Sequence, residues 1–175
     1  IFTYTNINDA SLNGIHGTLK HMTTVDLQTA PLPYLSTQNG DWNTKTTWTN
    51  GTMQSIPGAV SLVDRNMTVD WNIVKTAHAI VMANSSLPIL KKDNRTLLAL
   101  YVNANTLVLN GNSSAKEGHG LTISHYMSLI GKLDLEGESQ LIQNLDSHLD
   151  VAPSGALERD QQGPSDTFTY KYWSS

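Results

Sequence analysis

Short bursts of alternating apolar and polar residues fill the stretch from Leu97 to Asp160, and they constrain the fold more than any other feature. Alternation with a period of two places successive side chains on opposite faces of a β-strand. Each burst ends at Gly, Asn, Ser or Pro, which are the residues that favour tight turns. The stretch therefore predicts many short strands and an all-β fold.

A weak repeat in this stretch indicates how the strands are arranged. TLVLNGN at 106–112 matches KLDLEGE at 132–138, and HLDVAPS at 148–154 echoes both. The unequal spacing means that loops of different lengths separate the copies. Irregular rungs of this kind predict a right-handed parallel β-solenoid, in which neighbouring rungs stack to bury one face of each strand. A β-sandwich of short strands is the alternative.

The expected module covers residues 39–175, and residues 1–38 read as a lead-in segment that belongs with a preceding domain. Pro31 and Pro33 are expected to break any regular element in this lead-in. The chain starts at Ile1 without Met, so we read it as a processed product or a piece of a longer protein.

Two further stretches alternate clearly. Between Met67 and Ala83, one face of a predicted strand region carries Trp71, Ile73, Ala77, Ala79 and Val81. In the C-terminal tail, alternate aromatic residues are expected to cover the last rung; these are Phe168, Tyr170 and Tyr172.

Composition limits the classes of ligand, cross-link and membrane contact that the chain can have. Residues 113–175 carry four basic and nine acidic side chains, and this acidic half disfavours nucleic acid, whose phosphates attract basic surfaces. The chain has no cysteine, which excludes disulfides and thiolate metal sites. It also has no apolar run of about 18 residues, so we expect it not to span a membrane.

Trp42 and Trp48 lie between the turn dipeptides of GDWNTKTTWTNG. One interpretation makes the two indoles a cover over the open end of a core. The other makes them an aromatic platform that contacts a glycan or another surface through its ring faces.

The carboxylates Asp134, Glu136 and Glu138 alternate with Leu133 and Leu135, so they are expected to project outward together. Such a stripe is a candidate weak Ca²⁺ site, since Ca²⁺ favours clustered oxygen ligands. We expect no other cofactor and no catalytic residue, because the stripe lacks the basic companion that polysaccharide-cleaving chemistry requires. His119 and His125 are interpreted as a turn-flanking and a surface histidine rather than a metal pair.

The combination of GDWNTKTTW, LTISHYMSLIGKLDLEGESQLIQ and GALERDQQGPSDTFTYKYWSS resembles modules of large secreted surface proteins of Bacteroidetes, notably flavobacteria. Such proteins are similar to gliding-motility adhesins and other cargo of the type 9 secretion system. The resemblance covers residues 39–175, and its C-terminal part, from Leu157 to Ser175, is the most specific.

This resemblance implies an extracellular structural or adhesive module at the cell surface, with a part in gliding motility or attachment and no catalysis. It implies partners among other domains of the same large protein, secretion or outer-membrane anchoring proteins, and glycans or surfaces. A carbohydrate-binding or polysaccharide-processing β-helix domain is the alternative.

Overall fold

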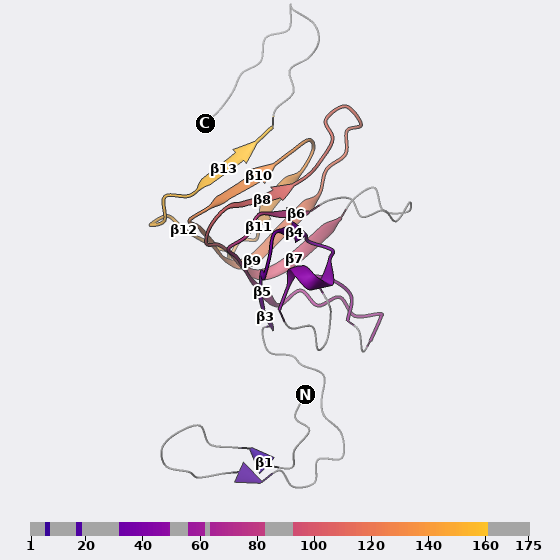
Figure 1. Cartoon of the computed structure of the whole chain (residues 1–175), viewed down its shortest axis with the longest axis vertical. Coiled ribbons are helices and arrows are strands. Elements are labelled where there is room, and N and C mark those ends of the chain that lie inside the picture. The colour runs from indigo at the N-terminus through magenta and orange to yellow at the C-terminus, as the bar shows by residue number, and fades with distance from the viewer. Residues whose placement is uncertain are drawn as a thin grey trace, which may run out of the picture.

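The computed structural model describes residues 6–7, 17–18, 32–49, 56–61, 64–82 and 93–160. Within these ranges the chain is all-β, as predicted, and its one helical element is a 3-10 turn, η1 (Lys45–Thr47). The strands form two large sheets (Figure 1). The six-stranded sheet holds β3 (Leu32–Leu35), β5 (Asn72–Thr76), β7 (Asn94–Val102), β9 (Gly120–Leu129), β11 (Gln140–Gln143) and β12 (His148–Asp150). The five-stranded sheet holds β4 (Gly40–Asp41), β6 (Ile80–Met82), β8 (Thr106–Leu109), β10 (Lys132–Leu135) and β13 (Ala156–Arg159). A separate antiparallel pair consists of β1 (Asn6–Ile7) and β2 (Gly17–Thr18).

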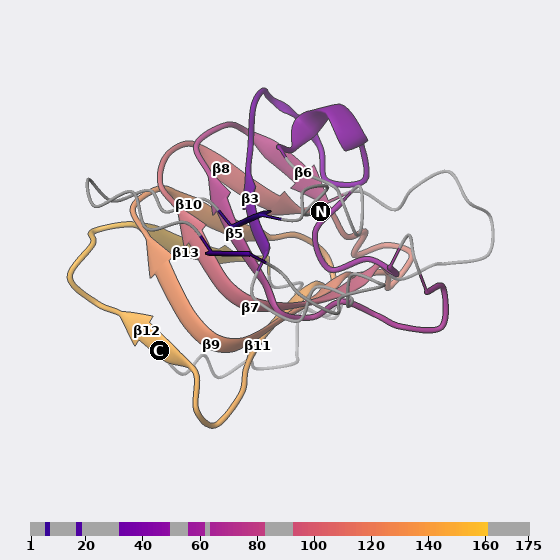
Figure 2. The same ribbon diagram turned by 90° about the horizontal axis from the view of Figure 1, so that it is seen from below.

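From β3 to β11 the chain alternates between the two large sheets, one strand at a time. Every strand pairing within these sheets is parallel. Figure 2 shows the result from below: β6, β8 and β10 lie on one side of the molecule, and β7, β9 and β11 on the other. Parallel neighbours need a crossover connection rather than a hairpin, and here the crossover passes through the opposite sheet.

Apolar side chains at equivalent positions of successive strands form continuous inward columns. In the five-stranded sheet, Ile80, Leu107 and Leu133 lie in register and are fully buried. The predicted repeat at 106–112 and 132–138 is confirmed by this pairing of β8 with β10. Each such side chain stabilises the fold by about 1.5–3 kcal/mol relative to an exposed one. The core therefore forms between the two sheets, and no single strand could close it alone.

The third copy of the repeat does not lie beside the first two. β12, which holds the first residues of HLDVAPS, pairs with β9 in the six-stranded sheet, and β13 takes the position beside β10. Between β10 and β13 the chain forms two successive strands of the six-stranded sheet, β11 and β12. Only then does it return to the five-stranded sheet. A pattern match over four residues does not contain the loop lengths, and these decide which sheet a strand joins.

Two local predictions were wrong. Leu32–Leu35 forms β3 despite Pro33, because β3 is an edge strand, where a missing N–H can face away from the ladder. The six-stranded sheet thus begins before residue 39. In β5 and β6 the buried face carries the opposite parity from the one predicted, namely Asn72, Val74, Thr76, Ile80 and Met82. The predicted aromatic cover from Phe168, Tyr170 and Tyr172 lies outside the described residues.

Candidate functional site

Trp42 and Trp48 are packed inside the fold, with 0% and 6% of their surfaces exposed. Their rings meet edge to face with centroids 4.9 Å apart. Trp42 Nε1 donates to the carbonyl oxygen of Pro57 at 3.1 Å, and Trp48 Nε1 donates to the carbonyl oxygen of Trp42 at 2.8 Å. With the ring faces covered and both N–H groups paired, this geometry argues against a sugar-stacking platform. It favours the interpretation in which the two indoles cover the core beside β3 and β4.

The carboxylate stripe does not form as predicted, because β10 ends at Leu135 and the chain turns at Gly137, whose φ is +59°. Asp134 instead pairs with Lys132, whose Nζ lies 3.0 Å from Asp134 Oδ2 and 2.9 Å from Glu158 Oε2. Among the described residues, Asp134, Glu136 and Glu138 do not form a group that could hold a metal ion. Asp134 is thus engaged by Lys132, and the candidate Ca²⁺ site stays a prediction.

An outward ladder crosses four strands of the six-stranded sheet. Lys75 Nζ lies 5.0 Å from the ring centroid of Tyr101, which lies 5.2 Å from that of Tyr126, and His148 follows at 6.0 Å. Tyr126 also donates a 2.8 Å hydrogen bond to Asp150 Oδ2. Because each tyrosine ring has a neighbour on either side, the ladder links neighbouring strands and offers little free ring face to a ligand.

The electrostatics of this ladder follow from its hydrogen bonds. The Ala152 N–H and the Tyr126 hydroxyl both donate to Asp150 and hold the pKa of its carboxyl below the ordinary value of 3.8. The same Asp150 carboxylate raises the pKa of Tyr126 above 10.0. The pair is only half-buried, so the shifts describe a contact at the surface.

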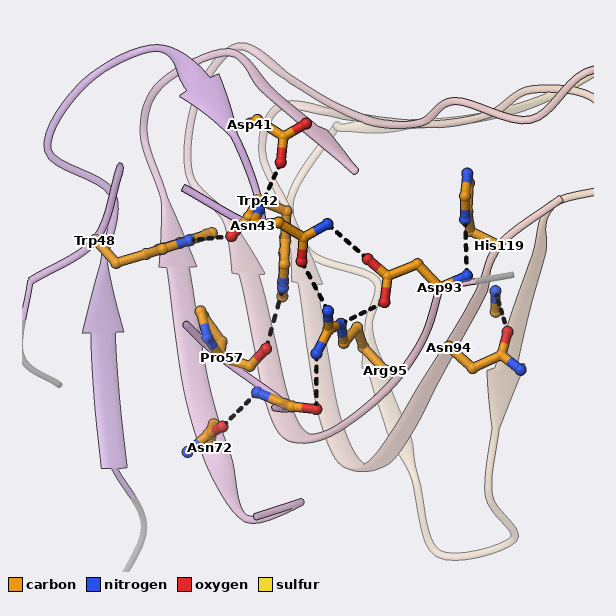
Figure 3. Close-up of polar contacts among 12 residues, drawn as sticks. Asp41, Trp42, Asn43, Trp48, Pro57, Asn72, Asp93, Asn94, Arg95 and His119 are labelled. Atoms are coloured by element: carbon orange, nitrogen blue, oxygen red, sulfur yellow. Dashed lines mark hydrogen bonds and ion pairs between the residues drawn. The ribbon is translucent and has the colours of Figure 1, made fainter. Parts of the chain in front are cut away.

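Arg95 forms a clasp between segments that are far apart in the sequence (Figure 3). Its terminal nitrogens donate to Asn43 Oδ1 at 2.7 Å and to the Gly58 carbonyl oxygen at 3.3 Å, and its Nε lies 2.7 Å from Asp93 Oδ1 without hydrogen-bond alignment. Asn43 Nδ2 closes the ring of contacts by donating to Asp93 Oδ2 at 2.8 Å. Arg95 and Asp93 are engaged with each other and with the backbone, so neither is free to act as an acid or a base on a substrate.

His119 extends this clasp and is 3% exposed. Its Nδ1 accepts from the Asp93 N–H at 3.1 Å, so its Nε2 carries the proton and donates to the Asn110 carbonyl oxygen at 3.1 Å. Its own N–H donates to Ser139 Oγ. These partners give the imidazole a structural role.

A surface groove of about 210 Å³ lies beside this histidine, over the beginnings of β7, β9 and β11. Asn94, Gly120 and Gln140 stand in one register row, and Thr122 and Ile142 stand in another. Asn94 Oδ1 accepts the Gly120 N–H at 2.9 Å, and a Cβ on Gly120 would lie 2.7 Å from this oxygen, so a larger residue there would displace the Asn94 side chain. Figure 3 shows Asn94 directed away from the Arg95 guanidinium, on the groove side of β7.

The groove presents polar side chains that have no partner within the described part of the chain: Thr122, Glu138 and Gln140. Glu138 is the one residue of the predicted carboxylate stripe that lines it. Sequence reasoning also singled out His119, as a turn-flanking residue, and it missed the other groove residues. A signal did exist, because Gly120 follows Asn94 by the same 26 positions that separate the repeat at 106 from the repeat at 132.

No family model, no curated protein and no solved structure matches this chain. Within the residues that the structure describes, no helix is long and apolar enough to cross a membrane.

Proposed function

We propose that the chain is a scaffold module of a large extracellular protein, built as a parallel β-solenoid with irregular rungs, whose role is structural or adhesive. The observation that carries the proposal is the inward column Ile80, Leu107, Leu133 and Leu157, which runs through four parallel strands in register. The first three side chains are fully buried, whereas Leu157 is 52% exposed. In such a stack each rung packs on its two neighbours, and the stack lengthens when rungs are added.

The coil is proposed to be right-handed. Each pair of parallel neighbours in one sheet is connected by a crossover through the other sheet, and such connections are right-handed in about 98% of cases. The parallel pairing also favours the solenoid over the β-sandwich alternative, because sandwiches are built from antiparallel strands.

The cellular setting rests on the resemblance of GDWNTKTTW and LERDQQG to modules of large secreted surface proteins of Bacteroidetes. On this proposal the module is exported by the type 9 secretion system, displayed on the cell's outer surface, and used in gliding motility or attachment. Its partners are neighbouring domains of its own protein, proteins that secrete or anchor it, and glycans or surfaces. The module is not a catalyst, and the engaged pair Asp93 and Arg95 supports that reading.

The test is protease shaving of intact cells that produce the protein, followed by immunodetection of the module. Surface display predicts that proteinase K removes the module from intact cells while a cytosolic marker survives. It also predicts that inactivating the type 9 secretion system leaves the module inside the cell. Protection of the module in intact cells, with digestion only after lysis, would overturn the proposal.

A further inference from the structure

The groove over β7, β9 and β11 combines three features that belong to recognition rather than to folding. It is hollowed, with a volume of about 210 Å³. It carries amide, hydroxyl and carboxylate groups at Gln140, Thr122 and Glu138. It also carries an apolar surface at Ile142, which is 46% exposed. Sites for small ligands typically join an apolar surface with a few polar groups that fix orientation.

The walls of this groove are held in place by buried contacts. The Asp93 N–H donates to His119, and the Asp93 side chain contacts Arg95. Asn94 lies between Asp93 and Arg95 in the chain, so its backbone is held in place on both sides. On the opposite side, Ser139 Oγ accepts the His119 N–H and donates to the Leu109 carbonyl oxygen. Ser139 is fully buried and lies between the groove residues Glu138 and Gln140. A site supported in this way loses little conformational entropy when it binds.

We propose that this groove binds a neutral glycan, with one sugar residue held between Gln140, Thr122 and Ile142. Amides and hydroxyls both donate and accept, which matches the hydroxyl groups of a sugar. The exposed side of Ile142 supplies contact for the apolar C–H face. The groove is smaller than the roughly 300 Å³ at the lower limit of drug-sized pockets, so it suits one monosaccharide unit of a chain.

The charge of the groove selects against anionic ligands. Among the residues that the structure describes, its lining holds one carboxylate, Glu138, and no lysine or arginine. A phosphate, a sulfate or a uronic acid would meet repulsion from Glu138 without a compensating cation. A neutral sugar instead offers hydroxyl donors to the same carboxylate, which forms charge-assisted hydrogen bonds.

A bound peptide strand fits the groove less well. β7 pairs with β5 and β9, and β9 pairs with β7 and β11, so the backbone groups of both strands are already used within the sheet. Strand addition needs an unpaired edge, which β11 alone of these three strands offers, and an added strand would lie in the plane of the sheet rather than in the groove over its face. The polar groups that the groove offers to a ligand belong to side chains. Its three strands together span about 10 Å, at a strand spacing of about 4.8 Å.

A neutral glycan in this groove would be the ligand of the proposed adhesive module. The inference rests on the proposed function only for its cellular setting.

The test uses the purified full chain and calorimetric titration with neutral hexasaccharides of glucose, mannose and xylose, with an oligogalacturonate as the anionic counterpart. We expect at least one neutral hexasaccharide to bind more tightly than the oligogalacturonate. Absence of neutral binding at millimolar concentration, or tighter binding of the oligogalacturonate, would overturn the proposal.

A matched pair of variants locates the site. Gln140→Ala removes a groove amide and should weaken binding about fivefold, the worth of one hydrogen bond. Gln143→Ala removes the same group from the same strand outside the groove and should leave affinity unchanged. Equal affinity of Gln140→Ala and the original chain would contradict the inference. If Gln140→Ala does not fold, amide NMR shifts of Gln140 and Thr122 on adding sugar to the original chain decide instead, and unmoved amides count against the groove.

Binding and surface display fail separately. A chain that binds neutral glycans but stays inside cells refutes the cellular setting and keeps the groove. A chain that is displayed on cells but binds no glycan refutes the groove and keeps the scaffold.

Discussion

Trp48 Nε1 donates a 2.8 Å hydrogen bond to the carbonyl oxygen of Trp42, so the second indole is anchored on the backbone of the first. The two rings also meet edge to face, an arrangement that stabilises aromatic pairs beyond the area they bury. Since both rings are buried, this pair acts in folding, and its removal should be measured as lost stability.

Trp42→Ala should lower the free energy of unfolding by about 3–5 kcal/mol, because it leaves a large cavity and an unpaired Pro57 carbonyl oxygen. Equilibrium unfolding in urea, followed by Trp fluorescence or circular dichroism, measures the change. Leu145→Ala is the control, because that side chain is 100% exposed and should cost under about 0.5 kcal/mol. A Trp42→Ala chain as stable as the control would refute the buried cover.

Leu107 and Leu157 occupy one inward column, at 0% and 52% exposure. Leu107→Ala should cost about 2–5 kcal/mol, and Leu157→Ala should cost less than half as much, because burial of the deleted methyl groups sets the penalty. The same urea titrations measure both. Equal costs would mean that Leu157 is covered in solution, and would contradict an exposed end at β13.

Much of this column could be predicted from the sequence, because Leu107, Leu109, Leu133 and Leu135 alternate within matching heptapeptides. An alternation of apolar and polar residues predicts which residues of a strand face inward, provided that the inward residues are apolar. The prediction failed where they are not. Asn72 lies inward, and its Oδ1 accepts the Gly58 N–H at 2.6 Å, a contact that no local pattern contains.

The candidate groove was harder to predict, because it depends on register between distant strands. Tyr126 lies opposite Ala99 rather than Leu100, since the register shifts between Leu97 and Ala99. A single bulge of this kind changes which outward residues become neighbours. The indoles Trp42 and Trp48 present a related difficulty, because an indole has both a large apolar face and a polar N–H and suits either a core or a binding surface.

Gly137→Ala should destabilise the chain strongly, by more than about 2 kcal/mol. Gly137 has a φ of +59°, and an added Cβ would lie 2.4 Å from the Asn112 backbone nitrogen, so neither conformation nor space accommodates a side chain. Asn105→Gly is the control, since Asn105 also has a positive φ, of 59°, and loses mainly its hydrogen bond to Ala77. Thermal unfolding of both variants compares them; a smaller loss for Gly137→Ala than for Asn105→Gly would contradict the tight turn.

Arg95 and Lys132 provide a contrast between a buried and an exposed ion pair. Arg95→Met leaves Asp93, whose side chain is 13% exposed, without its cation, and should cost about 3 kcal/mol. Lys132→Met breaks the contacts with Asp134 and Glu158 at the surface and should cost at most about 1 kcal/mol. Urea unfolding at low and high salt distinguishes them, because screening weakens the exposed pair more. A larger cost for Lys132→Met would refute the clasp.

Tyr126→Phe should raise the pKa of Asp150 toward 3.8 without restoring it, because the Ala152 N–H, the larger cause of the lowering, remains. In the original chain the folded-state pKa of Asp150 lies below its unfolded value, so the carboxylate stabilises the fold above about pH 4. This stabilisation is lost as the pH falls through the folded-state pKa. Carbon-13 NMR titration of the Asp150 carboxyl between pH 6 and pH 2 measures the shift in both chains. An unchanged Asp150 pKa in Tyr126→Phe would show that the 2.8 Å contact between these side chains does not persist in solution.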